Sequence, residues 1–203
     1  MYTDTPVHEV AAFGHCAKPQ SPSVNQPALG LALVLLLMLT TLVYLPGLSG
    51  GFIFDDYPFI VENTYVQVDS LRLSEWMEAA FSFGASHQGR MLSQLSFAAN
   101  HFLTGLDPFW MKLTNLCIHL GNGVLLFVML RALFDLWREA APHDTSVSRA
   151  RAPWVALAIS AVWLLLPVNL TAVLYIAQRM ESLSNSFVLL GLWIYLRARI
   201  RYR

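Results

Sequence analysis

Two adjacent carboxylates, Asp55 and Asp56, are the residues of this sequence best suited by type to acid–base chemistry. They lie in the stretch GGFIFDDYPFI, between aromatic and branched apolar residues, just after the first long apolar segment. Like charges side by side repel each other, and apolar surroundings raise the cost of ionising either one. The pair is therefore either a solvated acidic cap or a catalytic site in which a carboxylate takes a proton from a hydroxyl group.

Three basic residues could complete such a site by binding a phosphate. Arg179 stands at the end of a long charge-free stretch, Arg90 follows Gly89 at the expected start of a helix, and Lys112 begins a polar helical face. A guanidinium can bind a phosphate through two parallel hydrogen bonds, and the amides at a helix N-terminus also favour anions. The alternative for Arg179 is an anchor at the membrane interface.

Further polar residues fall on helical faces next to these cations. The residues of the first face are spaced by three, four and three positions: Lys112, Asn115, His119 and Asn122. A similar face opens the last apolar segment: Gln178, Glu181, Ser182 and Asn185. Polar faces in membrane helices turn toward protein or a water-filled cavity, although they can serve only to hydrogen-bond neighbouring helices. No cluster of side chains at metal-ligand spacing surrounds His119, so we predict no metal site.

The elements that must position these residues are apolar helices. The chain has 203 residues, of which 56% are hydrophobic and 13% charged, and its formal net charge is zero. Average soluble domains carry about 25% charged residues. Four long segments contain no charged residue: 19–54, 113–130, 152–178 and 182–196. Since about 20 apolar residues cross a bilayer, the sequence predicts an integral membrane protein, and its neutral balance gives no reason to expect a nucleic-acid partner.

We therefore expect an all-α, polytopic membrane protein with four transmembrane helices. The expected spans are about 27–48, 109–133, 153–167 and 180–196. Residues 1–26 are polar and rich in Pro and Ser, which predicts a disordered tail, and residues 27–203 form the membrane module. The outer loop 49–107 contains two stretches, starting near Ser70 and Gly89, that predict one or two helices lying at the membrane surface.

The distribution of basic residues predicts the orientation in the membrane. Four arginines lie between positions 131 and 151, and the chain ends in RARIRYR, whereas the loop 49–107 is mostly acidic. Basic loops stay in the cytoplasm. We expect both termini to be cytoplasmic in a multi-pass protein of a bacterial inner membrane, with the acidic loop in the periplasm.

Three motifs resemble the N-terminal part of bacterial GT-C-fold glycosyltransferases, relatives of the protein O-mannosyltransferases that often carry C-terminal tetratricopeptide repeats. The motifs are FIFDDYPFIVEN, GRMLSQLSFAANHFLTGLDPFWMKLTNLCIHLGNGVLLFVMLRALF and LLPVNLTAVLYIAQRMESLSNSFVLLGLWIYLRAR. The resemblance implies transfer of a sugar from a polyprenyl-phosphate carrier to an acceptor on the outer face. It also implies that Asp55 or Asp56 is the catalytic carboxylate and that Arg90 and Arg179 bind the carrier phosphate.

Members of that family have many more spans, so we expect this module to be incomplete alone. Its expected partners are membrane lipid, the lipid-linked sugar, and further membrane helices from a longer chain or from other subunits. No cofactor beyond the sugar donor is implied, and a divalent metal is compatible with the motifs but not indicated. The alternative is a non-enzymatic transmembrane subunit of a larger complex, built on a truncated scaffold of this kind.

Overall fold

Four long helices dominate the structure, a computed structural model that describes residues 26–82, 90–140 and 150–202. They are α1 (Gln26–Tyr44), α4 (Pro108–Ala140), α5 (Ala152–Leu165) and α7 (Arg179–Arg201). Every regular element in the described ranges is helical, which confirms the all-α prediction. The expected disordered tail, apart from Gln26, lies outside the described residues.

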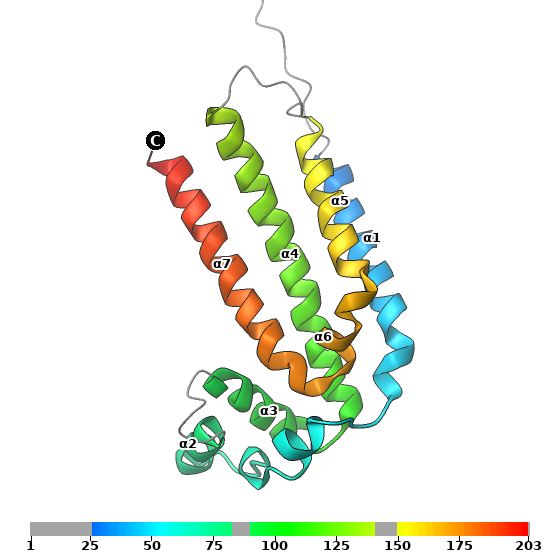
Figure 1. Cartoon of the computed structure of the whole chain (residues 1–203), viewed down its shortest axis with the longest axis vertical. Helices are drawn as coiled ribbons and strands as arrows, with labels where there is room; N and C mark the ends of the chain where they lie inside the picture. Colours follow the sequence, from blue (N-terminus) through cyan, green and yellow to red (C-terminus); the bar gives the residue numbers. More distant parts are fainter. Residues whose placement is uncertain (1–25, 83–89, 141–149, 203) are drawn as a thin grey trace, which may run out of the picture.

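Shorter elements gather at one end of the long helices, opposite the C-terminus (Figure 1). They are η1 (Leu45–Ser49), the π-helical turn η2 (Tyr57–Val61), η3 (Thr64–Val66), α2 (Leu73–Phe81) and α3 (Met91–Thr104). The helices α2 and α3 match the two surface helices expected in the loop. Before α2, the hydroxyl of Ser70 donates to Glu75 at 2.8 Å, and the Ser70 amide donates to the same carboxylate at 3.3 Å. These bonds fix the chain as it enters the helix.

The connection from α5 to α7 is broken into three short pieces at the same end. They are η5 (Pro167–Asn169), α6 (Leu170–Leu174) and η6 (Ile176–Gln178). Proline cannot donate the backbone bond that a continuing helix needs. Accordingly α5 ends before Pro167, and the chain bends by 53° between α5 and the segment Pro167–Leu174. The long apolar segment is therefore kinked at this proline.

Within the described residues, the number of helices able to cross a membrane is two to three by length and composition, whereas the sequence analysis expects four spans. The segment Gln26–Ser49 and α4 qualify alone, and α5 with the bent segment Pro167–Leu174 makes a third if the pair counts as one span. Helix α7 has 23 residues but is not among them. Its first half carries serine and asparagine as well as Arg179 and Glu181, and these residues reduce its apolar character.

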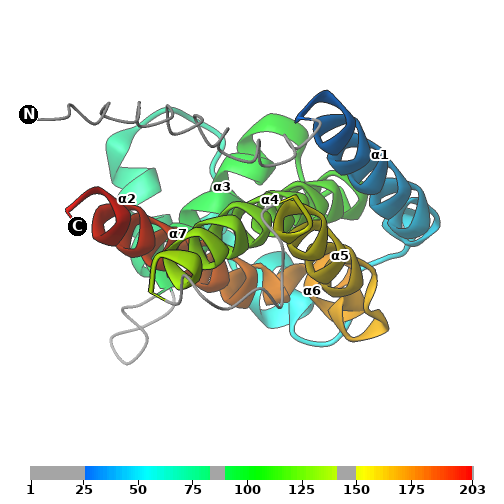
Figure 2. The same ribbon diagram turned by 90° about the horizontal axis from the view of Figure 1, so that it is seen from above.

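Helix α4 lies at the centre of the long helices. It packs against α7 on one side and α5 on the other, and α1 packs against α5 (Figures 1 and 2). The core between α1, α4 and α5 contains six buried apolar side chains: Leu29, Leu36, Phe127, Ala156, Leu157 and Leu164. Helices α4 and α5 approach closely at Gly123, where an added Cβ would come within 2.6 Å of the Leu164 side chain.

A second core joins the loop elements to α4 and α7. Its buried members are Ile60, Val66, Phe97, Met111, Ile176 and Met180. They come from η2, η3, α3, α4, η6 and α7, so segments more than 100 residues apart in sequence meet in one cluster. This core fixes the loop that carries the acidic pair against the start of α7.

Candidate functional site

The two neighbouring carboxylates have different environments. Asp56 is 0% exposed, whereas Asp55 is exposed. The carboxylate of Asp56 accepts one hydrogen bond from the amide of Ile53 at 3.0 Å and another from the amide of Ala177 at 2.8 Å. These bonds tie the loop before η2 to η6, 121 residues later in the chain. Asp56 is therefore a buried structural residue whose hydrogen bonds hold the loop in place. Asp55 is the carboxylate that solvent or a ligand can reach.

Burial changes the protonation equilibrium of Asp56. Loss of water around the carboxylate raises its pKa, while the backbone amides and the charge of Lys112 oppose that rise without cancelling it. A raised pKa means that the ionised form costs more in the folded chain than in water.

The backbone is strained at the residue before Asp55, the exposed carboxylate. Phe54, directly before it, has a φ of 44° and is 82% exposed. Positive φ is unfavourable for a bulky side chain, and such strain is often found at functional sites. The amide of Asp55 donates to the Tyr175 hydroxyl at 3.0 Å. Burial raises the pKa of Tyr175, and the nearby carboxylates of Asp55 and Asp56 raise it further.

Tyr175 was missed by the sequence analysis. It follows α6, directly before η6, and no motif or helical spacing marked it. Only the tertiary fold brings its hydroxyl to a residue 120 positions earlier. A protonated hydroxyl beside an exposed carboxylate can orient that carboxylate or share a proton with it.

Arg179 occupies the interior beneath this loop. It is 0% exposed, and its guanidinium lies 4.6 Å from the centroid of the Phe97 ring. It donates at 2.7 Å to the Asn115 side-chain oxygen and at 2.8 Å to the Met111 carbonyl. It also donates at 3.0 Å to the Ser96 carbonyl and at 3.3 Å to the Ser96 hydroxyl. Arg179 thus joins α7 to α3 and α4, and the chain itself takes up its hydrogen-bonding capacity.

Lys112 is also buried and engaged by the chain. Its ammonium group donates to the carbonyls of Gly50 and Gly51 at 2.7 and 3.0 Å. Its charge acts on Asp56, although among the described residues no direct ion pair joins the two side chains. Lys112 therefore holds the backbone that leads from η1 into the acidic loop.

The remaining polar face of α4 is buried, as its spacing predicts, and bonds the neighbouring elements. The Asn115 side chain donates to the Tyr175 carbonyl at 3.2 Å, and Asn122 donates to the Ser182 carbonyl at 2.9 Å. The His119 ring lies 3.1 Å from the Leu164 carbonyl and stacks on Trp163 at a centroid distance of 4.9 Å. The three hydrogen bonds hold α4 to other parts of the chain, and those to Leu164 and Ser182 are interhelical bonds of the kind that the sequence analysis kept as the alternative to a ligand site.

In the described ranges, Gln178, Glu181 and Asn185 make no hydrogen bond or ion pair with Asp55 or Asp56. Gln178 is the last residue of η6 and is half-buried, and Glu181 and Asn185 are exposed on α7. Arg90 directly precedes α3. The Ser96 residue that accepts from Arg179 lies six positions further along, roughly 9 Å at the rise of an α-helix. Their site roles remain predictions.

The arrangement offers acid–base chemistry at one carboxylate and a buried positive charge below it. Asp55 is exposed, with the Tyr175 hydroxyl beside it, while Lys112 and Arg179 place two cations behind the loop. In the described part of the chain no group of three or more His, Cys, Asp or Glu side chains could hold a metal ion. Comparison of the chain with models of protein families, with curated proteins and with solved structures finds no match.

Proposed function

We propose that the chain is a GT-C-type glycosyltransferase module that transfers a sugar from a polyprenyl-phosphate carrier to an acceptor hydroxyl. The reaction takes place on the outer, periplasmic face of a bacterial inner membrane, and both termini are cytoplasmic. The observation that carries the proposal is the separation of roles in the acidic pair. Asp56 is buried and fastened, which leaves Asp55 exposed next to Tyr175, on a loop at the end of apolar helices.

In this mechanism Asp55 is the general base. It accepts the proton of the acceptor hydroxyl as that oxygen bonds to the anomeric carbon, and the bond from that carbon to the carrier phosphate oxygen breaks. The phosphate leaves with the electron pair, and nearby cations stabilise its charge. Asp56 acts as a positioning residue because its two amide bonds fix the loop.

The three predicted phosphate ligands contribute in different ways. Lys112 and Arg179 have their donors bonded to the chain, so either would have to exchange those bonds to contact a carrier phosphate directly. Their charges still favour an anion nearby, since a buried cation is weakly screened. Arg90, the third predicted phosphate ligand, directly precedes α3.

A module of this size needs a partner to enclose a lipid-linked donor. Helix α1 exposes a run of large apolar side chains: Leu31, Val34, Leu35, Met38, Leu39, Leu42 and Val43. Helix α7 does the same at Phe187, Val188, Leu192 and Ile194. These faces suit lipid or the helices of a longer chain or of other subunits.

The second candidate function is a non-enzymatic subunit of a membrane complex. The contacts of Arg179 favour it, because the guanidinium finds four acceptor atoms within the chain and needs no ligand. A side chain satisfied in this way is explained by packing alone.

Sugar transfer by membranes containing the full chain tests the proposal. With polyprenyl-phosphate mannose or glucose as donor, Asp55→Asn should lower transfer by about 10²- to 10⁴-fold, the usual contribution of a general base. Glu62→Gln is the matched control, because Glu62 is an exposed carboxylate in the same loop, and it should leave transfer unchanged. Labelling of Ser74→Cys by an impermeant thiol reagent in intact cells, with the native cysteines replaced, checks the orientation.

Two results would decide against catalysis. One is equal transfer by wild type and Asp55→Asn at matched expression. The other is a wild-type chain that transfers neither sugar but is purified in fixed stoichiometry with other membrane proteins, which would favour the subunit.

A further inference from the structure

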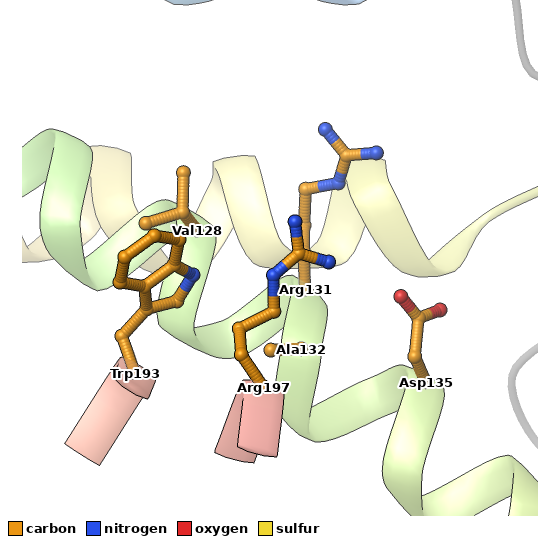
Figure 3. Close-up of a pocket in the computed structure, with 6 residues that line it drawn as sticks. All are labelled: Val128, Arg131, Ala132, Asp135, Trp193 and Arg197. Carbon is orange, nitrogen blue, oxygen red and sulfur yellow. The ribbon is translucent and has the colours of Figure 1, made fainter. Parts of the chain in front are cut away.

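A small cavity lies between α4 and α7, far from the acidic loop. It has a volume of about 160 Å³ and is lined by Val128, Arg131, Ala132, Asp135, Trp193 and Arg197 (Figure 3). These residues come from the last turns of the two helices, at the end of the molecule opposite α2 and α3 (Figure 1). None of them belongs to the proposed transferase site.

Two guanidiniums in this cavity have uncommitted hydrogen-bonding capacity. Arg131 lies over the Phe127 ring at 5.6 Å and Arg197 over the Trp193 ring at 5.8 Å. Within residues 26–82, 90–140 and 150–202 neither guanidinium has a recorded hydrogen bond or ion pair. In Figure 3 both extend upward to the same side of the cavity, and the Trp193 ring stands to their left. Two adjacent guanidiniums in a polar recess form an anion-binding arrangement.

The single acid of the cavity does not cancel their charge. The carboxylate of Asp135 lies 3.4 Å from the guanidinium of Arg138, one turn further along α4. With Arg138 paired to that carboxylate, the charges of Arg131 and Arg197 remain. The cavity therefore favours an anion over a neutral or zwitterionic group.

The position of the cavity along the helices indicates which anion. Arg131 is the first charged residue after the charge-free stretch 113–130 of α4, and Arg197 is the first after the stretch 182–196 of α7. Both arginines thus stand where the apolar part of each helix ends, at the level of lipid phosphates if these helices lie in a bilayer. Trp193, one turn deeper, is of the residue type enriched at that boundary.

The walls fit the same occupant. Val128 and the Trp193 ring give an apolar side toward the charge-free stretches of α4 and α7, and the two guanidiniums give a polar side one turn further along each helix. A glycerophospholipid matches these two sides, because its phosphodiester is anionic and its acyl chains are apolar. Basic pockets between membrane helices bind anionic lipid headgroups in this way.

We propose that the recess between α4 and α7 binds the headgroup of an anionic glycerophospholipid, with Arg131 and Arg197 contacting its phosphate. The site is independent of the proposed sugar transfer, since it lies at the opposite end of the bundle. It ties α7, the least apolar of the four long helices, to the membrane and to α4.

Native mass spectrometry of the purified full chain tests this site. The chain is equilibrated with equal amounts of phosphatidylglycerol and phosphatidylcholine in detergent, and the lipid retained is counted. Wild type should retain phosphatidylglycerol preferentially. Arg131→Gln and Arg197→Gln should each weaken that retention about fivefold, the effect of about 1 kcal/mol per basic residue near a lipid surface. Arg199→Gln is the matched control, because Arg199 is exposed on the same helix and does not line the recess.

A separate arm distinguishes a lipid from a free anion. Inorganic phosphate at millimolar concentration should not displace phosphatidylglycerol, because it lacks the apolar part that the walls contact. Displacement by phosphate would reassign the recess to a free anion. Equal retention of the two lipids by wild type, or an equal loss in Arg199→Gln, would overturn the proposal whatever the folding of the recess variants.

Discussion

The two ends of α7 hold arginines in opposite circumstances. At the start of the helix Arg179 is 0% exposed and donates to four oxygen atoms from α3 and α4. About one turn before α7 ends at Arg201, Arg197 is exposed and lies over the Trp193 ring, and it has no hydrogen bond or ion pair with the described residues. Arg197 directly borders the charge-free stretch 182–196, and Arg179 lies three residues before that stretch, with Glu181 between them. The sequence pattern is therefore alike at both ends, and only the number of acceptors on neighbouring helices separates a structural arginine from one available to a ligand.

The largest effect expected from this contrast is on stability. Arg179→Met removes the donors to the Asn115 side chain, to the buried Met111 carbonyl and to the half-buried Ser96 carbonyl. Each buried acceptor left without a donor costs about 1–3 kcal/mol. The variant should lose about 3 kcal/mol or more of unfolding free energy, measured by denaturant titration in detergent. Arg197→Met, the matched change at the exposed end, should stay within about 0.5 kcal/mol of wild type. Comparable losses of unfolding free energy in Arg179→Met and Arg197→Met would contradict a structural role that is specific to Arg179.

A second, smaller loss of stability is expected in the middle of α4, where one glycine lies against a neighbouring helix and another faces open space. An added Cβ at Gly123 would meet three atoms of Leu164, which is itself 0% exposed, at 2.6–2.8 Å, whereas nothing lies within 4 Å of one at Gly121. Gly123→Ala should therefore destabilise the chain by about 1–3 kcal/mol, the usual cost of overpacking.

Gly121→Ala provides the control, two residues away on the same helix. It should be neutral or slightly stabilising, because alanine favours a helix more than glycine does. Thermal unfolding of both variants in detergent measures the difference. If Gly123→Ala unfolded at the wild-type temperature, the close approach of α4 to α5 would be loose enough to absorb a methyl group.

The sequence predicts those parts of the molecule that depend on local spacing. The steps of three and four between Lys112 and Asn122 place one face of α4 in the interior, and all four side chains of that face are buried. The break at Pro167 and the two surface helices follow from the same kind of local signal. The number of membrane spans was harder to predict because α7 mixes apolar residues with serine and asparagine. The length of its charge-free stretch alone overestimates how apolar this helix is.

The environment of the acidic pair could not be predicted in this way. The groups that distinguish Asp55 from Asp56 are the Tyr175 hydroxyl and the Ala177 amide, both about 120 residues away. Nothing local indicates which carboxylate turns inward, and the sequence analysis left the two as equals. The same long-range packing converts Arg179 from a predicted phosphate ligand into a bonded interior residue.

The smallest expected effect is the pH dependence that buried Asp56 adds to the stability of the chain. Burial raises the pKa of Asp56 above its ordinary value, so the folded chain binds its proton more tightly than the unfolded chain does. The stabilisation linked to this proton is fully present below the unfolded pKa, about 3.9 for aspartate. It is lost as the pH rises through the raised folded value, because the ionised form is then the one that is buried.

Asp56→Asn removes this titration while keeping one oxygen that can accept an amide bond. The stability of wild type relative to Asp56→Asn should therefore be highest at the acidic end of a series from pH 3.5 to neutral, and it should fall as the pH rises. Thermal unfolding of both proteins at each pH measures the difference, and Gly121→Ala, which keeps Asp56, should follow the wild-type curve. A difference that grew with rising pH would mean that the amides of Ile53 and Ala177, together with Lys112, outweigh desolvation. Asp56 would then be an ionised anchor, and the contrast with exposed Asp55 would be one of access alone.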